Sequence, residues 1–461
     1  MRVGLLLLAV GSLTCREADA VIEDPEELRA QSYLRDYLRI NTSNPPGNET
    51  AGARYLQRIL AERSIKSELV GSNQNRLSLY SRLRSGTTAP ALLLLHHIDT
   101  VPADPGEWSA NPFGGTMTGG YIRGRGALDI KSLGIAELMA FADLHKPGTR
   151  LTRDVIYLAV ADEESGGGRG CSELLVSRPD LFENVGYVIN EGGANETIVD
   201  RVSYWGIEVS QKIPLWVRLR VQGEAGHGSI PPDDGGSGGR LIELLSRVQK
   251  LERPYRLTPA VATQFRTLSE VKRGIKQEMM RDPERFFQSP RFEAEFPGAY
   301  RALLRDTLVV TGLSAGNEMN SVPSSASASV DIRLLPDASP DQMLARLRAL
   351  VGETAALEVI LKGEPTPQSP IDNGLYRLLV AKMRKAEPGS VVGPAVSPGT
   401  TDSRFFRQRG IVAYGVSPFK VNYYDAAGVH GVDERIRARF FWQGVRLMKD
   451  IVMDFCSTSA R

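Results

Sequence analysis

Cysteine is scarce in this sequence. Only three cysteines occur among 461 residues, and one of them, Cys15, falls in an N-terminal segment that we expect to be removed. The remaining two, Cys171 and Cys456, are too few for a disulfide framework. In an oxidising compartment they could pair with each other, but the default expectation is two small buried apolar side chains.

An excess of charge of either sign is also missing. The chain has 56 basic and 54 acidic side chains and a formal net charge of +2. Nucleic acids and anionic membranes attract strongly basic surfaces. The balance gives no electrostatic argument for either partner, so no nucleic acid partner is expected.

Long hydrophobic runs are absent except near the start of the chain. Arg2 precedes an apolar run over residues 3–13, and small residues follow at positions that suit cleavage before Val21. The run is too short to cross a bilayer. Residues 1–20 are therefore predicted to be a secretory signal peptide of a secreted or periplasmic protein, with no membrane span in the mature chain. An uncleaved N-terminal membrane anchor is the alternative.

The length of the chain predicts two or three domains. Over the first 205 residues, short apolar segments with strand character alternate with helical segments, which predicts an α/β sheet with parallel strand pairs. The expected strands cover 76–83, 91–96, 155–160 and 187–189, and the expected helices lie within 25–65 and at 132–144.

The pattern changes after residue 205. Residues 215–221 alternate apolar and basic side chains, as in a strand with one wet face. The segments that follow predict the order β-α-β-β-α-β of a ferredoxin-like domain; they lie at 240–250, 307–311, 326–335, 340–350 and 357–361. We therefore expect a catalytic domain formed by 21–205 and 365–461, with a second domain inserted at 206–364 and a charged helical insertion at about 252–306.

The chain has only five histidines, and one of them follows an expected strand. His97 stands two residues before Asp99, just where that strand ends. On open α/β sheets, ligands bind beyond the carboxyl ends of strands. An imidazole can bind a metal ion while a carboxylate holds its other ring nitrogen. His97 is therefore a candidate metal ligand with Asp99 as its partner, whereas His96 is expected to pack or to form a hydrogen bond.

Other acidic groups mark turns of the same domain. Asp129 stands in a glycine-rich turn, where it either caps a helix or bridges two cations. Glu163 and Glu164 follow an apolar strand, and adjacent carboxylates repel each other unless a cation or proton intervenes. Glu191 follows the next strand, and His430 lies beside acidic residues near the C-terminus. Each has an ordinary alternative as a polar loop residue. Together they predict a metal site that suits zinc, with cobalt or manganese as substitutes.

Eight motifs in order resemble those of one enzyme family. They are HHIDTVP, GRGALDIK, ADEESGG, NEGG, GHGSIPP, NSVP through DIR, GTTDSRFFR and VHGVDERI. The family is that of the zinc peptidases and amidohydrolases, which include acetylornithine deacetylase, succinyl-diaminopimelate desuccinylase, aminoacylase and carboxypeptidase S. The resemblance covers nearly the whole mature chain, and it is closest to carboxypeptidase S and the secreted N-acyl-amino-acid hydrolase/synthase group. It implies a two-zinc aminopeptidase-like catalytic domain with an inserted ferredoxin-like lid or dimerisation domain.

The resemblance also implies roles for individual residues. His97, Asp129 and Glu191 would hold one zinc ion, and Asp129, Glu164 and His430 the other. Asp99 would orient His97, Glu163 would be the general base, and His227 would polarise the scissile carbonyl. The carboxylate end of the substrate would meet Asn320, Arg333, Gly399, Thr400 and Arg404. A homodimer through the lid domain is implied, although the 252–306 insertion leaves a monomer open.

These features predict a zinc-dependent hydrolase that cuts an amide or peptide bond adjacent to a free carboxylate, as a carboxypeptidase or dipeptidase does. An N-acyl-amino-acid amidohydrolase, able to run in either direction, is the alternative. In the insertion, an apolar group either forms core or lines an acyl site; it comprises Phe265, Met279, Met280, Phe286 and Phe287. A catalytically silent binding protein on the same fold would be expected to have lost ligands, and a periplasmic solute-binding protein requires no paired glutamates.

Overall fold

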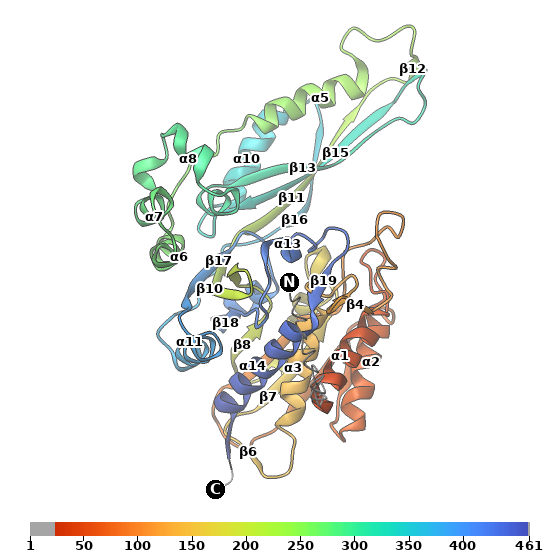
Figure 1. The fold of residues 1–461 in the computed structure, drawn as a ribbon. Coiled ribbons are helices and arrows are strands. Elements are labelled where there is room, and N and C mark those ends of the chain that lie inside the picture. Colours follow the sequence, from red (N-terminus) through yellow and green to blue (C-terminus); the bar gives the residue numbers. More distant parts are fainter. Residues whose placement is uncertain (1–23, 460–461) are drawn as a thin grey trace, which may run out of the picture.

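The computed structural model describes residues 24–459, so the expected signal peptide and Cys15 lie outside the described residues. Two main β-sheets organise this part of the chain, and Figure 1 shows the smaller one above the larger one. Among residues 24–459, no helix combines the length and the apolar character that a membrane crossing requires.

The larger sheet has nine strands. Eight of them run in the order β1-β2-β7-β3-β8-β18-β10-β17, and β9 pairs with β10 off this path. They are β1 (Glu68–Val70), β2 (Ser78–Leu83), β3 (Ala91–His97), β7 (Val155–Val160), β8 (Val185–Asn190), β9 (Ala194–Ile198), β10 (Arg201–Gln211), β17 (Val391–Ser397) and β18 (Val412–Gly415). The central strands β7, β3, β8 and β18 are parallel, so their carboxyl ends meet at one edge. The expected parallel pairs are thus present, in a sheet that is mixed because its outer pairs include antiparallel ones.

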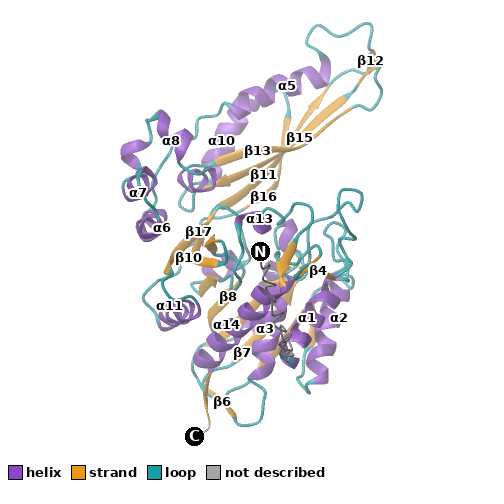
Figure 2. Ribbon diagram, viewed as in Figure 1, coloured by secondary structure: helices purple, strands orange, loops and turns teal. Residues whose placement is uncertain are grey.

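Helices cover both faces of this sheet (Figure 2). One face packs on α1 (Pro25–Leu38), α2 (Glu49–Glu62), α3 (Lys131–Asp143), α11 (Gly374–Ala386) and α14 (Ala438–Cys456), and the other on α4 (Cys171–Ser177) and α12 (Ser403–Arg407). Every residue of β7 is buried, as an apolar strand covered on both faces should be. Cys171 and Cys456 are both buried and unpaired.

The smaller sheet has four antiparallel strands in the order β13-β15-β11-β16. In chain order the elements are β11 (Ile213–Gln222), α5 (Gly236–Gln249), β13 (Thr307–Ala315), β15 (Ser325–Leu334), α10 (Pro340–Val351) and β16 (Ala356–Lys362). This β-α-β-β-α-β order is the expected ferredoxin-like arrangement. Alternate side chains of β11 and β15 are buried beneath α5 and α10, which leaves the other face of the sheet open. We call residues 213–362 the lid.

On its way from the larger sheet into the lid, the chain crosses over a single residue. β10 ends at Gln211 and β11 begins at Ile213, so only Lys212 lies between them. The buried ammonium of Lys212 donates to the carbonyls of Ala302 and Arg305 at 3.0 Å. The junction is therefore held by the segment that leads into β13.

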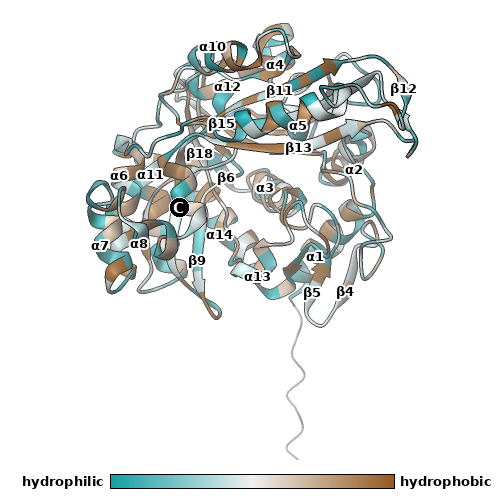
Figure 3. Ribbon diagram, turned by 90° about the horizontal axis from the view of Figure 1, so that it is seen from above, coloured by the Kyte–Doolittle hydropathy of each residue, from teal (hydrophilic) through white to brown (hydrophobic). Residues whose placement is uncertain are grey.

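The expected helical insertion packs on the larger sheet. It comprises α6 (Pro259–Leu268), α7 (Ile275–Arg281), α8 (Pro290–Glu295) and α9 (Gly298–Arg301) with short 3-10 turns between them. Its apolar side chains share a core with Tyr204 of β10 and Val396 of β17. Figures 1 and 3 both place α6, α7 and α8 on the side of α11 and away from β12 (Gly226–His227).

Short elements complete the chain. They are a three-stranded sheet of β4 (Thr116–Thr118), β5 (Tyr121–Arg123) and β19 (Arg435–Arg437), the pair β6 (Thr149–Leu151) and β20 (Ser457–Ser459), the pair β12 and β14 (Ser321–Val322), the turn η1 (Glu163–Ser165) and the helix α13 (Tyr423–Ala426).

Candidate metal centre and substrate cleft

Three parallel strands deliver polar side chains to one edge of the larger sheet. His97 is the last residue of β3, Glu163 and Glu164 follow β7 in η1, and Glu191 follows β8 directly. Because parallel strands end at the same edge, these side chains meet although the sequence separates them by up to ninety-four positions. Asp129 joins them from the turn before α3.

Asp129 lies between the two histidines. Its Oδ1 is 3.1 Å from Nε2 of His97, and its Oδ2 is 3.1 Å from Nε2 of His430. His430 also stands 3.2 Å from Glu164 Oε2, and His97 stands 3.7 Å from Glu191 Oε1. The structure therefore brings together all five side chains that were predicted to bind metal, with Asp129 between the two histidines.

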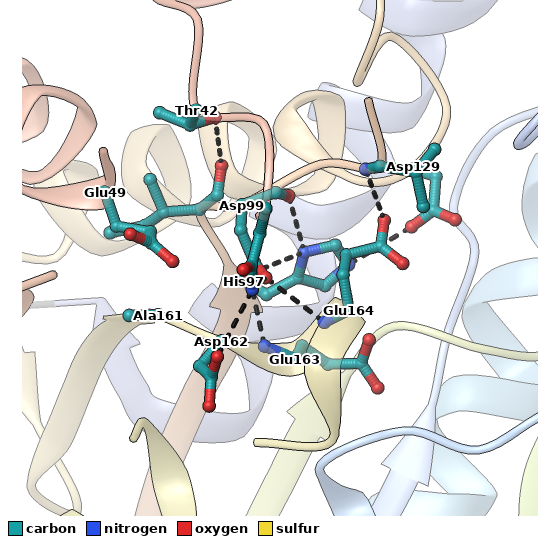
Figure 4. A network of polar contacts seen from close by, with 12 residues as sticks. Thr42, Glu49, His97, Asp99, Asp129, Ala161, Asp162, Glu163 and Glu164 are labelled. Carbon is teal, nitrogen blue, oxygen red and sulfur yellow. Dashed lines mark hydrogen bonds and ion pairs between the residues drawn. The ribbon is translucent and has the colours of Figure 1, made fainter. Parts of the chain in front are cut away.

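Two overlapping sets of donor atoms could each hold a cation. One set is His97, Asp129 and Glu164, and the other is His97, Glu163 and Glu191; within each set the donor atoms lie within 4.8 Å of one another. Imidazole and carboxylate donors at such separations suit divalent metal ions. Figure 4 shows His97 with Asp129 and Glu164 beside it, and Glu163 on the adjoining turn.

The charges of the cluster indicate a need for a cation. Burial, and then the neighbouring Glu191 carboxylate, raise the pKa of Glu163 well above its usual value. Burial also raises the pKa of Glu191, although His97 opposes the shift. Hydrogen bonds to Asp129 and Glu164 raise the pKa of His430 to about 10. Without a metal ion, bound protons therefore offset the repulsion between crowded carboxylates, and a divalent cation would do so instead.

Asp99 positions both His97 and the turn that carries Glu163 and Glu164. Nδ1 of His97 lies 2.9 Å from the backbone carbonyl of Asp99 and 3.5 Å from its carboxylate. The two carboxylate oxygens instead accept hydrogen bonds, each 3.2 Å long, from the backbone N–H groups of Glu163 and Glu164. Asp99 thus fixes the turn that presents both glutamates, a contact that spacing alone did not reveal.

A buried polar network holds this turn in place. Asn44 donates to Asp99 at 2.8 Å and to Asp162 at 3.2 Å. Asp162 also pairs with Arg76 at 2.8 Å, and Arg76 in turn contacts the fully buried Glu49. No local sequence pattern predicted this network, because its members come from separate loops. The one available signal was the Pro/Asn/Gly-rich turn around Asn44.

Glu434 holds the loop that carries Asp129. It is fully buried, and its Oε1 accepts from the N–H of Leu128 at 2.6 Å, while its Oε2 accepts from Gly126 and from Arg125, both at 2.9 Å. The segment containing His430 and the loop containing Asp129 are thereby joined. Glu434 belongs to the quoted VHGVDERI motif, but no role was predicted for it.

A cleft of about 640 Å³ connects the cluster with the open face of the lid. Its lining includes Asp129, Glu163, Glu164, Glu191 and His430 from the cluster and, of the predicted substrate residues, Arg333, Gly399 and Thr400. His227, Asn320 and Arg404 are not part of this lining. The cleft therefore has the candidate metal ligands on one side and the lid sheet on the other.

Arg333 and Arg404 differ in their surroundings. Arg333 lines the cleft and forms a fork with Asp331, with distances of 2.8 and 3.1 Å. Arg404 is buried, and its guanidinium donates to the carbonyls of Thr401 and Gly166. Arg404 thus ties its own loop to the loop that follows Glu164 and offers no free edge to the cleft.

His227 and Asn320 stand at the far tip of the lid. Both are exposed, and they belong to the β12–β14 end of the lid that Figure 1 shows remote from the larger sheet. Nδ1 of His227 accepts from the backbone N–H of Ser229 at 3.2 Å. A neutral imidazole so bonded carries its proton on Nε2. Within one chain these two residues do not reach the cluster.

The apolar residues of the insertion form core. Phe265, Met279 and Met280 are buried, and Phe286 and Phe287 pack partly buried against them. None of the five lines the cleft. His96 is likewise buried, where its ring packs near Tyr157 and Tyr37 with no hydrogen bond to its nitrogens.

Comparison with known proteins decides the family. Residues 93–454 match Peptidase family M20/M25/M40, most of the chain. The chain belongs to this family. The chain is 28% identical over 441 residues to N-fatty-acyl-amino acid synthase/hydrolase PM20D1 of Xenopus tropicalis, covering 91% of this chain and 85% of the relative. It is 28% identical over 443 residues to aminoacylase-1 of Sus scrofa, covering 93% and 96%.

A solved structure shares this fold over most of the chain. The M20 family metallo-carboxypeptidase Sso-CP2 from Sulfolobus solfataricus superposes with a TM-score of 0.72 at 18% identity, over 93% of this chain and 99% of that one. Membership confirms the predicted α/β fold with an inserted second domain. It also confirms the predicted reaction class, a hydrolase of the M20 family that acts on amide bonds.

Proposed function

We propose that the protein is a zinc-dependent hydrolase that cuts an amide or peptide bond adjacent to a free carboxylate, in the manner of a carboxypeptidase or dipeptidase. The position of Asp129 between His97 and His430, 3.1 Å from each imidazole, carries this proposal. A carboxylate with one oxygen toward each of two histidines is suited to bridging paired metal ions. The alternative substrate is an N-acyl amino acid, which the names of the relatives at 28% identity favour.

The ligands divide between two ions. His97, Asp129 and Glu191 would hold one, and Asp129, Glu164 and His430 the other. Two imidazoles and three carboxylates suit zinc, with cobalt or manganese as substitutes. Paired divalent ions supply Lewis acidity and lower the pKa of a shared water.

Glu163 is the proposed general base. It lies in the same cleft as the ligands, and its pKa is raised by burial and by Glu191, which suits a group that must both accept and return a proton. Glu163 would take a proton from the attacking water and deliver it to the leaving nitrogen. Asp99 would act through the backbone of the Glu163 turn and through His97.

His227 and Asn320 are proposed to act from a second copy of the chain. Both are exposed at the lid tip and absent from the cleft of their own chain, so a lid-mediated homodimer would be needed to bring them to a site. The proton on Nε2 of His227 would then stabilise the oxyanion, a contribution worth roughly 100- to 1000-fold in rate. Gly399, Thr400 and Arg333 would contact the substrate directly, and Arg404 would shape the loop behind them.

Adjacent glutamates offer a matched test of the metal site and the base. Metal analysis is expected to find up to two zinc ions per chain. Glu163→Gln should keep both and lose roughly 100- to 10,000-fold in kcat on dipeptides or N-acyl amino acids. Glu164→Gln, the same substitution one residue on, should lose one ion, as should His430→Ala. Full activity in a chelator-treated, metal-free sample, or in Glu163→Gln, would refute the proposal.

Export is a separate proposal. The apolar run after Arg2 and the small residues before Val21 support a cleaved signal peptide over 1–20, with a membrane anchor as the alternative. N-terminal sequencing of the protein from its native compartment should begin at Val21. An intact Met1 would contradict cleavage.

A further inference from the structure

The open face of the lid sheet carries Arg333 beside an aromatic ring. On β11, Leu215 and Val217 are buried against the lid helices, so Trp216 between them projects from the opposite face. Trp216 pairs in register with Asp331 of β15, and Arg333 is the next residue of β15 on that face. Trp216, Asp331 and Arg333 all line the substrate cleft.

Two contacts hold the guanidinium of Arg333. Its Nε and Nη2 donate to the two carboxylate oxygens of Asp331, at 2.8 and 3.1 Å. Its Cζ lies over the indole ring of Trp216, 5.6 Å from the ring centroid, which is within the range of a cation–π contact. Asp331 therefore fixes one edge of the group, and the ring of Trp216 limits its movement.

The other edge of the guanidinium stays available. Among the residues that the structure describes, Nη1 of Arg333 has no hydrogen-bond partner. Nη1 and the second hydrogen of Nη2 still form a fork that can bind a carboxylate. Because the pair of Arg333 and Asp331 carries almost no net charge, a substrate carboxylate gains little from long-range attraction. Its binding depends on how well the fork is held in place.

Packing alone does not explain Trp216. Its indole N–H is buried without a hydrogen-bond partner in the described part of the chain, whereas Trp205 in the larger sheet donates to the carbonyl of Ser417 at 3.0 Å. A buried indole N–H usually finds a partner, because an unpaired buried donor costs free energy. Leucine or phenylalanine would fill the site without that cost. Among aromatic side chains, the tryptophan ring binds cations best, which suits its contact with Arg333.

Trp216 also lies between the fork and the catalytic turn. Leu361 of β16 pairs with Trp216 on the side away from Asp331. A Cβ atom built on Gly166, which ends the turn η1, would lie 3.1 Å from Leu361. One row of the sheet therefore runs from the turn to the strand that carries Arg333, with Trp216 at its middle.

We propose that Trp216 is a positioning residue for substrate binding: its ring, together with Asp331, holds the guanidinium of Arg333 so that the free edge receives the substrate carboxylate. This inference rests on the proposed function, in which Arg333 contacts the substrate, and it adds a residue that no motif suggested. A free arginine side chain loses much rotamer entropy when it is fixed. Trp216 and Asp331 fix it before the substrate arrives, so less is lost on binding.

The test compares acids with their amides. N-acetyl-leucine and glycyl-leucine, each as the free acid and as the C-terminal carboxamide, are assayed with zinc-loaded wild type and variants. Trp216→Leu should lower kcat/KM for the acids by roughly 2- to 30-fold relative to the carboxamides, mainly through KM, because the cation–π contact is lost. Trp216→Phe keeps an aromatic ring and should recover most of this ratio. A purely structural role would lower acids and amides alike, and an unchanged acid-to-amide ratio in Trp216→Leu would overturn the inference.

A double-mutant cycle separates positioning from direct contact. In an Arg333→Ala background the acid-to-amide ratio should already be low, and adding Trp216→Leu should not lower it further. A further fall would mean that Trp216 itself recognises the carboxylate, which contradicts a positioning role. Val309→Ala is the matched control. Val309 pairs with Asp331 from β13, but it is 55% exposed and outside the cleft lining, so the ratio should not change.

A binding measurement keeps the two proposals distinguishable. Calorimetry of N-acetyl-leucine and its amide with zinc-loaded Glu163→Gln, with and without Trp216→Leu, needs no turnover. Acid binding that weakens more than amide binding in the double variant supports the inference even if hydrolysis fails. Acid binding that is unchanged, that weakens only as much as amide binding, or that is absent altogether refutes it. The proposed function fails separately if wild type cleaves neither acid.

Discussion

Oε1 of Glu434 accepts a hydrogen bond, 3.0 Å long, from the backbone N–H of Asp129. The same carboxylate binds the preceding loop, so a buried acid four residues after His430 sets the position of Asp129, the proposed bridging ligand. Groups that orient a metal ligand typically matter 10- to 100-fold for metal affinity.

Glu434→Gln should therefore weaken zinc binding by roughly 10- to 100-fold. The two carboxylate oxygens of Glu434 accept hydrogen bonds from four donors, and the glutamine amide has only one acceptor oxygen. Zinc titration against a competing chelator measures the change, and kcat with saturating zinc shows how much activity returns. Asp433→Asn is the control: its partly buried side chain contacts Ser109 instead. Equal zinc affinity in the Glu434 and Asp433 variants would contradict the assigned role.

Metal uptake should release protons. The pKa of His430 is raised to about 10 by Asp129 and Glu164, so the metal-free imidazole is protonated at pH 7. A ligand imidazole must be neutral, so zinc displaces that proton and binds less tightly as pH falls. A pH-stat titration at pH 7 should record at least about one proton per chain. His430→Ala should release fewer protons, and a wild type that releases none would count against the site.

Phe265 should matter for stability and not for substrate choice. It is fully buried in the insertion core and absent from the cleft. Phe265→Ala should destabilise the protein by about 3–5 kcal/mol, seen as a lower midpoint in urea denaturation. The ratio of activities on long and short N-acyl amino acids should stay constant. A selective loss of long-chain activity would revive the acyl-site interpretation.

Two inactive chains should rescue each other if His227 acts across a dimer. A Glu163→Ala chain keeps its His227, and a His227→Ala chain keeps its Glu163. A mixed dimer would then contain one complete site, and activity should reappear after subunit exchange. Mixtures that contain hybrid dimers by native mass spectrometry but stay inactive would exclude action from the partner chain.

The local pattern of the sequence predicted most of the fold. β7 falls at Val155–Val160, just where the continuous apolar run placed a strand, because a strand buried on both faces admits few other sequences. The five candidate ligands were predicted because each stands at a strand end or a turn. Their mutual arrangement depends on strand order, which no local pattern encodes.

Other features depend on contacts between distant segments. Arg76 and Glu49 look like ordinary surface residues in the sequence, and only folding buries them beneath Asp162. Arg333 was predicted to meet the carboxylate end of the substrate, and only the structure shows that Asp331, two positions away on the same strand face, pairs with one edge of its guanidinium. His227 lies in its expected motif, but the motif alone does not say that the lid carries it away from its own cluster.

The helical insertion fastens the lid at a third point. At one end Arg256 pairs with Asp337, next to α10, and at the other Gln264 accepts from the N–H of Val396 in the larger sheet. A lid joined only at Lys212 and at the end of β16 could rotate as a flap. The insertion adds a third connection that resists such rotation. The protein should therefore select substrates by the fixed shape of an open groove and not by closing the lid over them.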